Sequence, residues 1–312
     1  MPAGTEVSRC DRRRSNGASE RTVNRSVESL KAFVSGSERP SSWRPVPGVV
    51  VVGAGKGGVG TSLISTLLAV EAARAGESVL LVDAAEGVGS LHLMLGVSDA
   101  GPGLEALRGG NVTAEALVVS VASGLDLFPG GAEPNLDGGP GERRALMRRV
   151  SGLFGRYSMV VIDAGSRVES VMAACRAGAE RLLCVTARDR LSLAASYALL
   201  KTARARVGAL PVELVVNRVG EQEARSVYAT VRAAAKNFID TDVGYGGAIP
   251  SDERLPELVE SGTALTQVDP SWVGASAAAI VMRRILMEGR AARESGDVAL
   301  PLRPLRGVEP AT

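Results

Sequence analysis

The sequence predicts an α/β fold with a doubly wound, mostly parallel sheet flanked by helices. Short apolar runs rich in β-branched residues alternate along the chain with longer segments of helical periodicity. The runs are apolar at consecutive positions, which is typical of strands buried on both faces. Of the 312 residues, 45% are apolar and 22% are charged, which suffices for a sizeable core. Strands that alternate with crossover helices indicate a parallel sheet.

The first strand is predicted at residues 49–52, a run of four valines. A glycine-rich turn follows it and leads into an apolar helix over about residues 62–75. Further strands are expected at residues 79–82, 125–128, 159–162, 182–185, 212–216 and 248–249. Further helices are expected near residues 141–155, 168–177, 191–207, 221–236, 252–261 and 271–288.

The chain divides into a basic arm, a folded domain and a tail. Residues 1–46 hold nine Lys and Arg against five Asp and Glu, are rich in Ser, Arg and Gly, and are expected to be mostly disordered. Within the arm, a short helix at 26–34 that forms on a partner and chance spacing in a disordered leader explain the pattern equally well. Residues 47–289 are predicted to form the domain, which is mildly acidic, and residues 290–312 a disordered tail.

Composition excludes several chemistries. His92 is the single histidine, so a multi-histidine metal site is impossible and a Ser-His-Asp triad would have to use this residue. Cys10, Cys175 and Cys184 form no CxxC pair, which predicts a reduced cytoplasmic compartment, and the last two are expected in the core. No stretch approaches the roughly 20 apolar residues that span a bilayer, so a soluble protein is expected.

A phosphate-binding loop is predicted between the first strand and its helix, at Gly55-Lys56-Gly57-Gly58-Val59-Gly60-Thr61-Ser62. The segment fits the template G-x-x-x-x-G-K-[ST] except at Thr61, where the template has lysine. Glycines let successive backbone N–H groups point into one concavity, and the following helix adds its positive end. The hydroxyl of Ser62 is suited to Mg²⁺. This pattern predicts a P-loop NTPase fold; a plain tight connection or a dinucleotide loop explains the spacing less well.

Lys56, one of only four lysines, lies early in this loop. The segment resembles the deviant Walker A motif of the MinD/ParA group of ATPases, K-G-G-V-G-K-[ST]. Residues 80–83 resemble that group's second strand, which ends in the first switch, and residues 160–163 resemble its Walker B strand. Residues 214–218 and 249–252 resemble the two segments that pack around adenine.

The resemblance implies a set of ligands and site residues. It implies ATP or ADP with Mg²⁺ as cofactors and a homodimer that forms around two nucleotides, with Lys56 crossing the interface. Mg²⁺ would lie near Ser62, Asp83 and Asp163. The residues expected around adenine are Asn217, Arg218, Pro250 and Asp252.

Within this group the sequence is most similar to the flagellar-number regulators of the FlhG/FleN type, on residues 196–201 and 236–239. The similarity implies a positional regulator of flagellar or cell-pole assembly. It also implies a contact of the N-terminal arm with an FlhF-like GTPase or another polar component. Ser26 stands where that family has a glutamine that stimulates the GTPase, and this departure argues against stimulation while it leaves docking open.

Two departures from the family predict weak or absent hydrolysis. Thr61 replaces the lysine that neutralises the β- and γ-phosphates, and loss of one charge-assisted contact costs roughly 1.5–3 kcal/mol, or about 10- to 100-fold in affinity. The family's switch reads Asp-Ala-Asp, whereas here Ala85 follows Asp83 and Ala84. Glu86 is adjacent, but a shift by one residue changes the direction of its carboxylate.

Two other functions fit parts of the sequence. A non-enzymatic scaffold of the TadZ/CpaE type, a pseudo-ATPase for pilus or polar machinery, accounts for Thr61 and Ala85. DNA partitioning of the ParA type needs a basic surface, and the acidic domain argues against it. The arginines 143, 144, 148 and 149 are expected on a solvated helix face. Any membrane contact is expected to be peripheral, at the inner face of the membrane or the cell pole.

Overall fold

The computed structural model describes residues 44–87, 89–131 and 139–294, and the arm segment 26–34 lies outside them. Its centre is an eight-stranded sheet in the order β3-β4-β2-β5-β1-β6-β7-β8. Neighbouring strands are parallel throughout except for the antiparallel pair β3 and β4. The strands are β1 (Val49–Ala54), β2 (Val79–Asp83), β3 (Val119–Ala122), β4 (Leu125–Phe128), β5 (Met159–Asp163), β6 (Arg181–Thr186), β7 (Val212–Asn217) and β8 (Gly244–Ile249).

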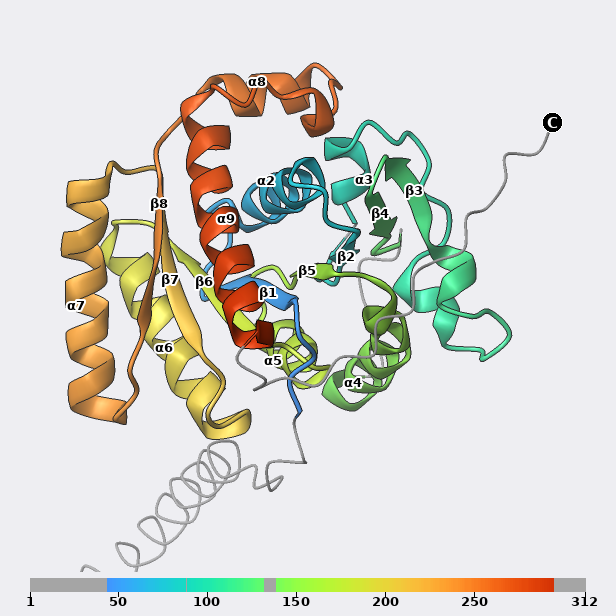
Figure 1. Ribbon diagram of the computed structural model, residues 1–312. Helices are drawn as coiled ribbons and strands as arrows, with labels where there is room; N and C mark the ends of the chain where they lie inside the picture. The colour runs from blue at the N-terminus through green and yellow to red at the C-terminus, as the bar shows by residue number, and fades with distance from the viewer. Residues whose placement is uncertain (1–43, 88, 132–138, 295–312) are drawn as a thin grey trace, which may run out of the picture. The chain divides into compact units, whose positions relative to one another are not determined.

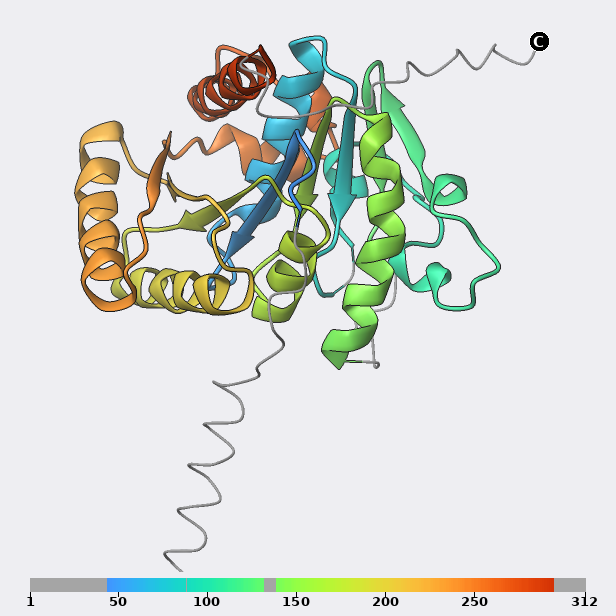
Figure 2. The same cartoon turned by 60° about the horizontal axis from the view of Figure 1, so that its bottom comes forward.

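Helices cover both faces of the sheet, as Figures 1 and 2 show. One face packs against α4 to α7, and the other against α2, α3, α8 and α9. These helices are α2 (Thr61–Arg74), α3 (Leu91–Met94), α4 (Gly139–Val150), α5 (Val168–Arg176), α6 (Arg190–Arg206), α7 (Glu221–Ile239), α8 (Arg254–Glu260) and α9 (Val273–Glu294). The predicted fold class, a doubly wound and mostly parallel sheet, is confirmed.

The central strands lie between two apolar layers. Val49 and Val51 of β1 belong to the core on the α4–α7 side, and Val50 and Val52 belong to the core on the α2 and α9 side. All four are fully buried, which explains why the run is apolar at every position rather than at every second one. Cys175 and Cys184 are buried as free thiols, so their prediction as core residues is confirmed.

Several elements differ from the sequence prediction. Strand β3, at the edge of the sheet, was not predicted. Its residues are partly buried or exposed, and Ser120 interrupts its apolar residues. Helix α4 ends at Val150 and continues as a 3₁₀ helix, Ser151–Arg156. The last helix continues to Glu294, beyond the predicted end at Glu288. Within the described residues, no helix combines the length and the apolar character needed to cross a bilayer.

The solvated face predicted for the arginines of α4 is confirmed only in part: Arg148 and Arg149 are exposed, Arg144 is partly buried, and Arg143 is buried. Arg143 is 4% exposed, and its guanidinium donates to the carbonyl oxygen of Ala84 at 3.4 Å. Arg149 donates to the carbonyl oxygens of Leu107 and Val112. These contacts form because the loops between β2 and β5 fold over this helix, and no periodicity in the sequence announces them.

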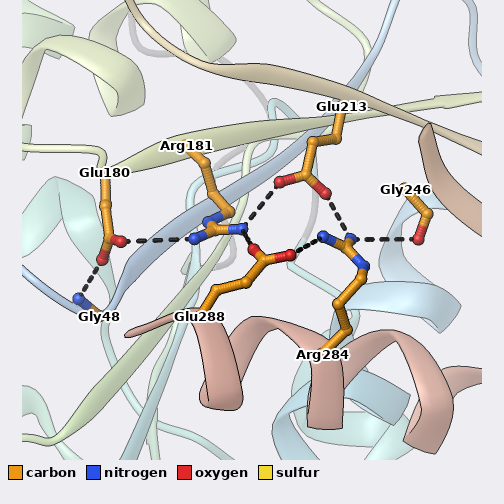
Figure 3. A network of polar contacts seen from close by, with 7 residues as sticks. All are labelled: Gly48, Glu180, Arg181, Glu213, Gly246, Arg284 and Glu288. Atoms are coloured by element: carbon orange, nitrogen blue, oxygen red, sulfur yellow. Dashed lines mark hydrogen bonds and ion pairs between the residues drawn. The ribbon is translucent and has the colours of Figure 1, made fainter. Parts of the chain in front are cut away.

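Five charged residues fasten α9 to the sheet, and we call them the α9 clasp: Glu180, Arg181, Glu213, Arg284 and Glu288 (Figure 3). Arg181 donates to Glu213 at 2.8 Å and to Glu288 at 2.5 Å, and Arg284 donates to the same two carboxylates. Glu180 accepts the N–H of Gly48, next to β1, at 2.6 Å. The clasp lies at the amino ends of β1, β6 and β7, away from the carboxyl ends that carry the predicted site.

Candidate functional site

Three segments of the predicted site meet at the carboxyl ends of β1, β2 and β5. Strand β5 lies between β1 and β2, and Asp83 and Asp163 are partners in the register of β2 and β5. The N–H of Ala54 donates to the carbonyl oxygen of Gly165 at 2.9 Å, and that of Ala84 to the carbonyl oxygen of Asp163 at 2.8 Å. Parallel strands place their carboxyl ends at one edge, and ligands of open α/β sheets bind there.

The phosphate loop adopts a conformation that its glycines make accessible. Gly58 and Gly60 have φ angles of +78° and +95°, in the left-handed region that favours glycine. Gly60 is the N-cap residue of α2. A Cβ atom on Gly60 would collide with the side chain of Asn217, whose amide donates to the carbonyl oxygen of Val59 at 2.7 Å. Asn217, at the end of β7, therefore holds the loop in place, and the loop leads directly into the N-terminus of a 14-residue helix.

Asp83 and Asp163 form a buried acid pair, with 2% and 0% of their surfaces exposed. Burial, together with the charge of Asp163, raises the pKa of Asp83 to about 7, although the N–H groups of Ser90 and Leu91 donate to its Oδ2. Burial also raises the pKa of Asp163, while the hydroxyls of Ser62 and Ser65 act in the opposite direction. Two buried carboxylates that repel one another fit a divalent cation, which would offset both charges.

One carboxylate oxygen of Asp163 is buried without a hydrogen-bond partner among the described residues. Its Oδ1 accepts the N–H of Gly165 at 3.1 Å, whereas its Oδ2 is buried with no hydrogen-bond partner in the described part of the chain. Such orphaned oxygens are rare in folded proteins and call for a ligand or water. Within the same residues, no group of three or more His, Cys, Asp and Glu could hold a metal ion. Asp83 and Asp163 supply only part of the oxygen ligands that a divalent cation takes, so a cation here would need further oxygens, such as those of a bound phosphate.

Lys56 extends from the phosphate loop toward α6. Its Nζ lies 3.7 Å from Oδ1 of Asp189, and 44% of its side chain is exposed. Asp189 is the N-cap of α6, where it accepts the N–H and the hydroxyl of Ser192, and these bonds lower the pKa of Asp189. An ion pair this exposed is weak, so it leaves Lys56 available to another anion.

The two positions that depart from the family pattern lie within the site. The side chain of Thr61 is buried at the start of α2 and brings no charge to the loop. Ala85 lies against the loop after β5, since a Cβ atom on Gly165 would approach the Cβ of Ala85 to 3.0 Å. No carboxylate projects from position 85.

The neighbouring carboxylate of Glu86 is held by two arginines. Its Oε1 lies 3.0 Å from Nη2 of Arg143, and its Oε2 pairs with Nε of Arg167. Burial lowers the pKa of Arg143, and the charge of Glu86 acts in the opposite direction. We call these three residues the Glu86 cluster. A carboxylate that neutralises two guanidinium groups is a poor base.

The residues predicted around adenine lie at the carboxyl ends of β7 and β8. Asn217 ends β7 and holds the phosphate loop, while Arg218 is exposed with a φ of +63°. The carboxylate of Asp252 accepts bonds from Arg254 and from the N–H of Gly274, so it organises the starts of α8 and α9. Pro250 is half-buried beside it. The adenine contacts of these four residues stay a prediction.

Sequence reasoning missed Asp189 and the Glu86 cluster. Asp189 precedes a helix with Ser192 three positions later, a capping pattern that could have located it, although not its contact with Lys56. Glu86, Arg143 and Arg167 come from three separate segments, and nothing in the sequence links them.

The fold and the loop together define a P-loop nucleotide-binding domain. The chain belongs to the family of CobQ/CobB/MinD/ParA nucleotide binding domains, whose profile matches residues 50–265. This confirms the resemblance to the MinD/ParA group.

Among individual proteins, the chain is similar to the antiactivator FleN of Pseudomonas aeruginosa, with 27% identity over 233 residues that cover 73% of this chain and 82% of FleN. It is 27% identical to the flagellum site-determining protein YlxH of Helicobacter pylori over 226 residues, 71% of this chain and 76% of YlxH. In fold it is similar to the cell division ATPase MinD of Pyrococcus furiosus, with a TM-score of 0.66 and 21% identity over 78% of this chain and all of that one.

Proposed function

We propose that this chain is a nucleotide-responsive positional regulator that acts in flagellar or other cell-pole assembly. The observation that carries the proposal is Lys56 within the phosphate loop, which is exposed and which, among the described residues, forms one exposed ion pair, with Asp189. Supporting it are the similarities to the antiactivator FleN and to YlxH, which is named as a flagellum site-determining protein. The nucleotide-bound form is a homodimer in which Lys56 leaves Asp189 and contacts the phosphates held by the partner subunit.

The chain's own residues divide the binding of ATP and Mg²⁺ among them. The N–H groups of residues 55–62 and the positive end of α2 hold the phosphates. Ser62, Asp83 and Asp163 hold Mg²⁺, which lowers the repulsion between the two buried carboxylates. The cation would also provide the orphaned Oδ2 of Asp163 with a partner. Asn217, Arg218, Pro250 and Asp252 surround the adenine.

Hydrolysis is slow or absent in this proposal. An attacking water needs a group that orients it, and position 85 offers only a methyl group. Glu86 is engaged by two arginines and cannot take that role. A phosphate-release assay is expected to give a steady-state rate more than tenfold below that of an intact relative; a rate within tenfold would contradict this part of the proposal.

The test is sedimentation velocity of the purified full chain with Mg²⁺ and ATP, with Mg²⁺ and ADP, and without nucleotide. ATP is expected to shift the chain from monomer to dimer. Lys56→Ala is expected to bind ATP, measured by calorimetry, and to remain a monomer. Lys201→Ala, which removes an exposed lysine of α6, is the matched control and should dimerise normally. Unchanged sedimentation of the wild type in ATP overturns the dimer switch.

The Glu86 cluster favours a second candidate, a scaffold that organises polar machinery without using nucleotide. In this alternative Thr61 and Ala85 are marks of a site that has lost its ligand, and the cluster stabilises the first switch in one conformation. Calorimetry with ATP and Mg²⁺ separates the two candidates. A scaffold of this kind gives no heat of binding, whereas the nucleotide switch binds with a measurable affinity.

A further inference from the structure

The turn that carries Arg167 lies directly against the phosphate loop. Arg167 is the N-cap residue of α5, which follows the loop after β5. The hydroxyl oxygen of the preceding residue, Ser166, lies 3.5 Å from the position that a Cβ atom on Gly57 would take. The carbonyl oxygen of Gly165 accepts the N–H of Ala54 at 2.9 Å. The backbone on which Arg167 is mounted is therefore fixed relative to the glycines that would hold the phosphates.

The side chain of Arg167 is the exposed member of the Glu86 cluster. Its side chain is 70% exposed, whereas those of Glu86 and Arg143 are 19% and 5% exposed. The two arginines therefore have different needs. Arg143 is buried and requires a carboxylate, because an unpaired charge in the interior is strongly unfavourable. Arg167 is largely in solvent and loses little when it leaves an ion pair.

If Arg167 left the cluster, each buried charge would still have a partner. Glu86 keeps Arg143 at 3.0 Å, and Arg143 keeps Glu86 together with the carbonyl oxygen of Ala84. The cluster thus holds one guanidinium more than its single carboxylate needs. The turn that carries this extra cation contacts the phosphate loop, which has Thr61 in place of the usual lysine. A terminal phosphate carries more negative charge than a carboxylate and matches the guanidinium fork in two parallel hydrogen bonds.

We propose that Arg167 supplies the positive charge that this phosphate loop lacks, by moving from Glu86 to the terminal phosphate of a bound nucleoside triphosphate. The inference rests on the proposed function, since it requires that nucleotide binds the loop. In this arrangement the cation that contacts the terminal phosphate comes from the loop after β5 instead of from the first turn of α2. It also makes Arg167 a specificity-determining residue, because a nucleoside diphosphate has no third phosphate to attract it.

The test compares Mg²⁺ with a non-hydrolysable ATP analogue and Mg²⁺ with ADP, each titrated by calorimetry into the full chain. Arg167→Ala is expected to weaken binding of the triphosphate by about 10- to 100-fold, the range for one charge-assisted contact, and to change the affinity for ADP by less than about threefold. Arg188→Ala is the matched control. Arg188 is 69% exposed, pairs with the single carboxylate of Glu223 and follows β6 at the same edge of the sheet. Its loss should leave both affinities unchanged.

A second variant distinguishes a role in binding from a structural one. In the Arg167→Ala background, Thr61→Lys is expected to restore triphosphate binding, because it returns a cation from the other side of the site. Equal weakening of triphosphate and diphosphate, or no weakening of either, overturns the role of Arg167. If the wild-type chain binds neither nucleotide, the proposed function itself fails, and the inference fails with it. Circular dichroism and urea midpoints of each variant establish that the fold is retained.

Discussion

Replacement of Asp83 by asparagine should stabilise the protein in the absence of divalent cations. Asp83 and Asp163 are buried side by side on neighbouring strands, and burial with mutual repulsion raises the pKa of Asp83 to about 7. In the unfolded chain the same group has its ordinary pKa of 3.8. At a pH between these two pKa values, Asp83 is protonated in the folded state and deprotonated in the unfolded state. The free energy of unfolding therefore falls as the pH rises from about 4 to about 7.

The size of the effect follows from the two pKa values. Each unit of difference corresponds to about 1.4 kcal/mol, so the penalty is about 2 kcal/mol at pH 5 and about 4 kcal/mol at pH 8. Asparagine has nearly the same shape without the charge, and its carbonyl oxygen can accept the N–H groups of Ser90 and Leu91 that now bond Asp83. The stability gap between Asp83→Asn and the wild type should widen by roughly 2–3 kcal/mol between pH 5 and pH 8.

Urea unfolding in EDTA at the two pH values measures this gap. Comparison of two pH values removes any packing difference between the side chains, because packing does not depend on pH. Glu223→Gln, which changes an exposed acid, is the control and should give no widening. A gap of the same size at pH 5 and pH 8, or one that narrows toward pH 8, would refute the reasoning.

Three further predictions concern stability. Glu213→Gln removes the carboxylate that Arg181 and Arg284 share in the α9 clasp, and it should lower the free energy of unfolding by about 2–3 kcal/mol in urea titrations. Glu257→Gln, at an exposed position of α8, is the control and should not lower it. Equal urea midpoints for the two variants would contradict the role of the clasp. Asn217→Ala removes the hydrogen bond to the carbonyl oxygen of Val59, so it should lower the free energy of unfolding by about 1–3 kcal/mol and speed amide hydrogen exchange in residues 55–60. Asn237→Ala, at an exposed position, is the control. Unchanged exchange in Asn217→Ala would show that β7 does not hold the loop. Lys56→Ala should change thermal stability by less than about 1 kcal/mol, because its ion pair with Asp189 is exposed, and a larger loss would assign Lys56 a structural role.

The sequence alone predicted those features that depend on local patterns. Consecutive apolar residues identified β1, β2 and β5 because a strand covered on both faces has no polar side. The glycine spacing identified the phosphate loop because left-handed φ angles, found here at Gly58 and Gly60, select that residue type. The edge strand β3 was not predicted, because its four half-exposed residues do not form an uninterrupted apolar run.

The tertiary structure decided which charged side chains meet. The register of β2 with β5 places Asp83 beside Asp163, and the packing of α4 brings Arg143 to Glu86. Arg167, at the start of α5, pairs with the same carboxylate but stays in solvent. The cap of α6 places Asp189 next to Lys56. Apolar burial repeats with the period of a helix or strand and can be read along the chain. An ion pair depends on two positions that only long-range packing brings together, and its members follow no period.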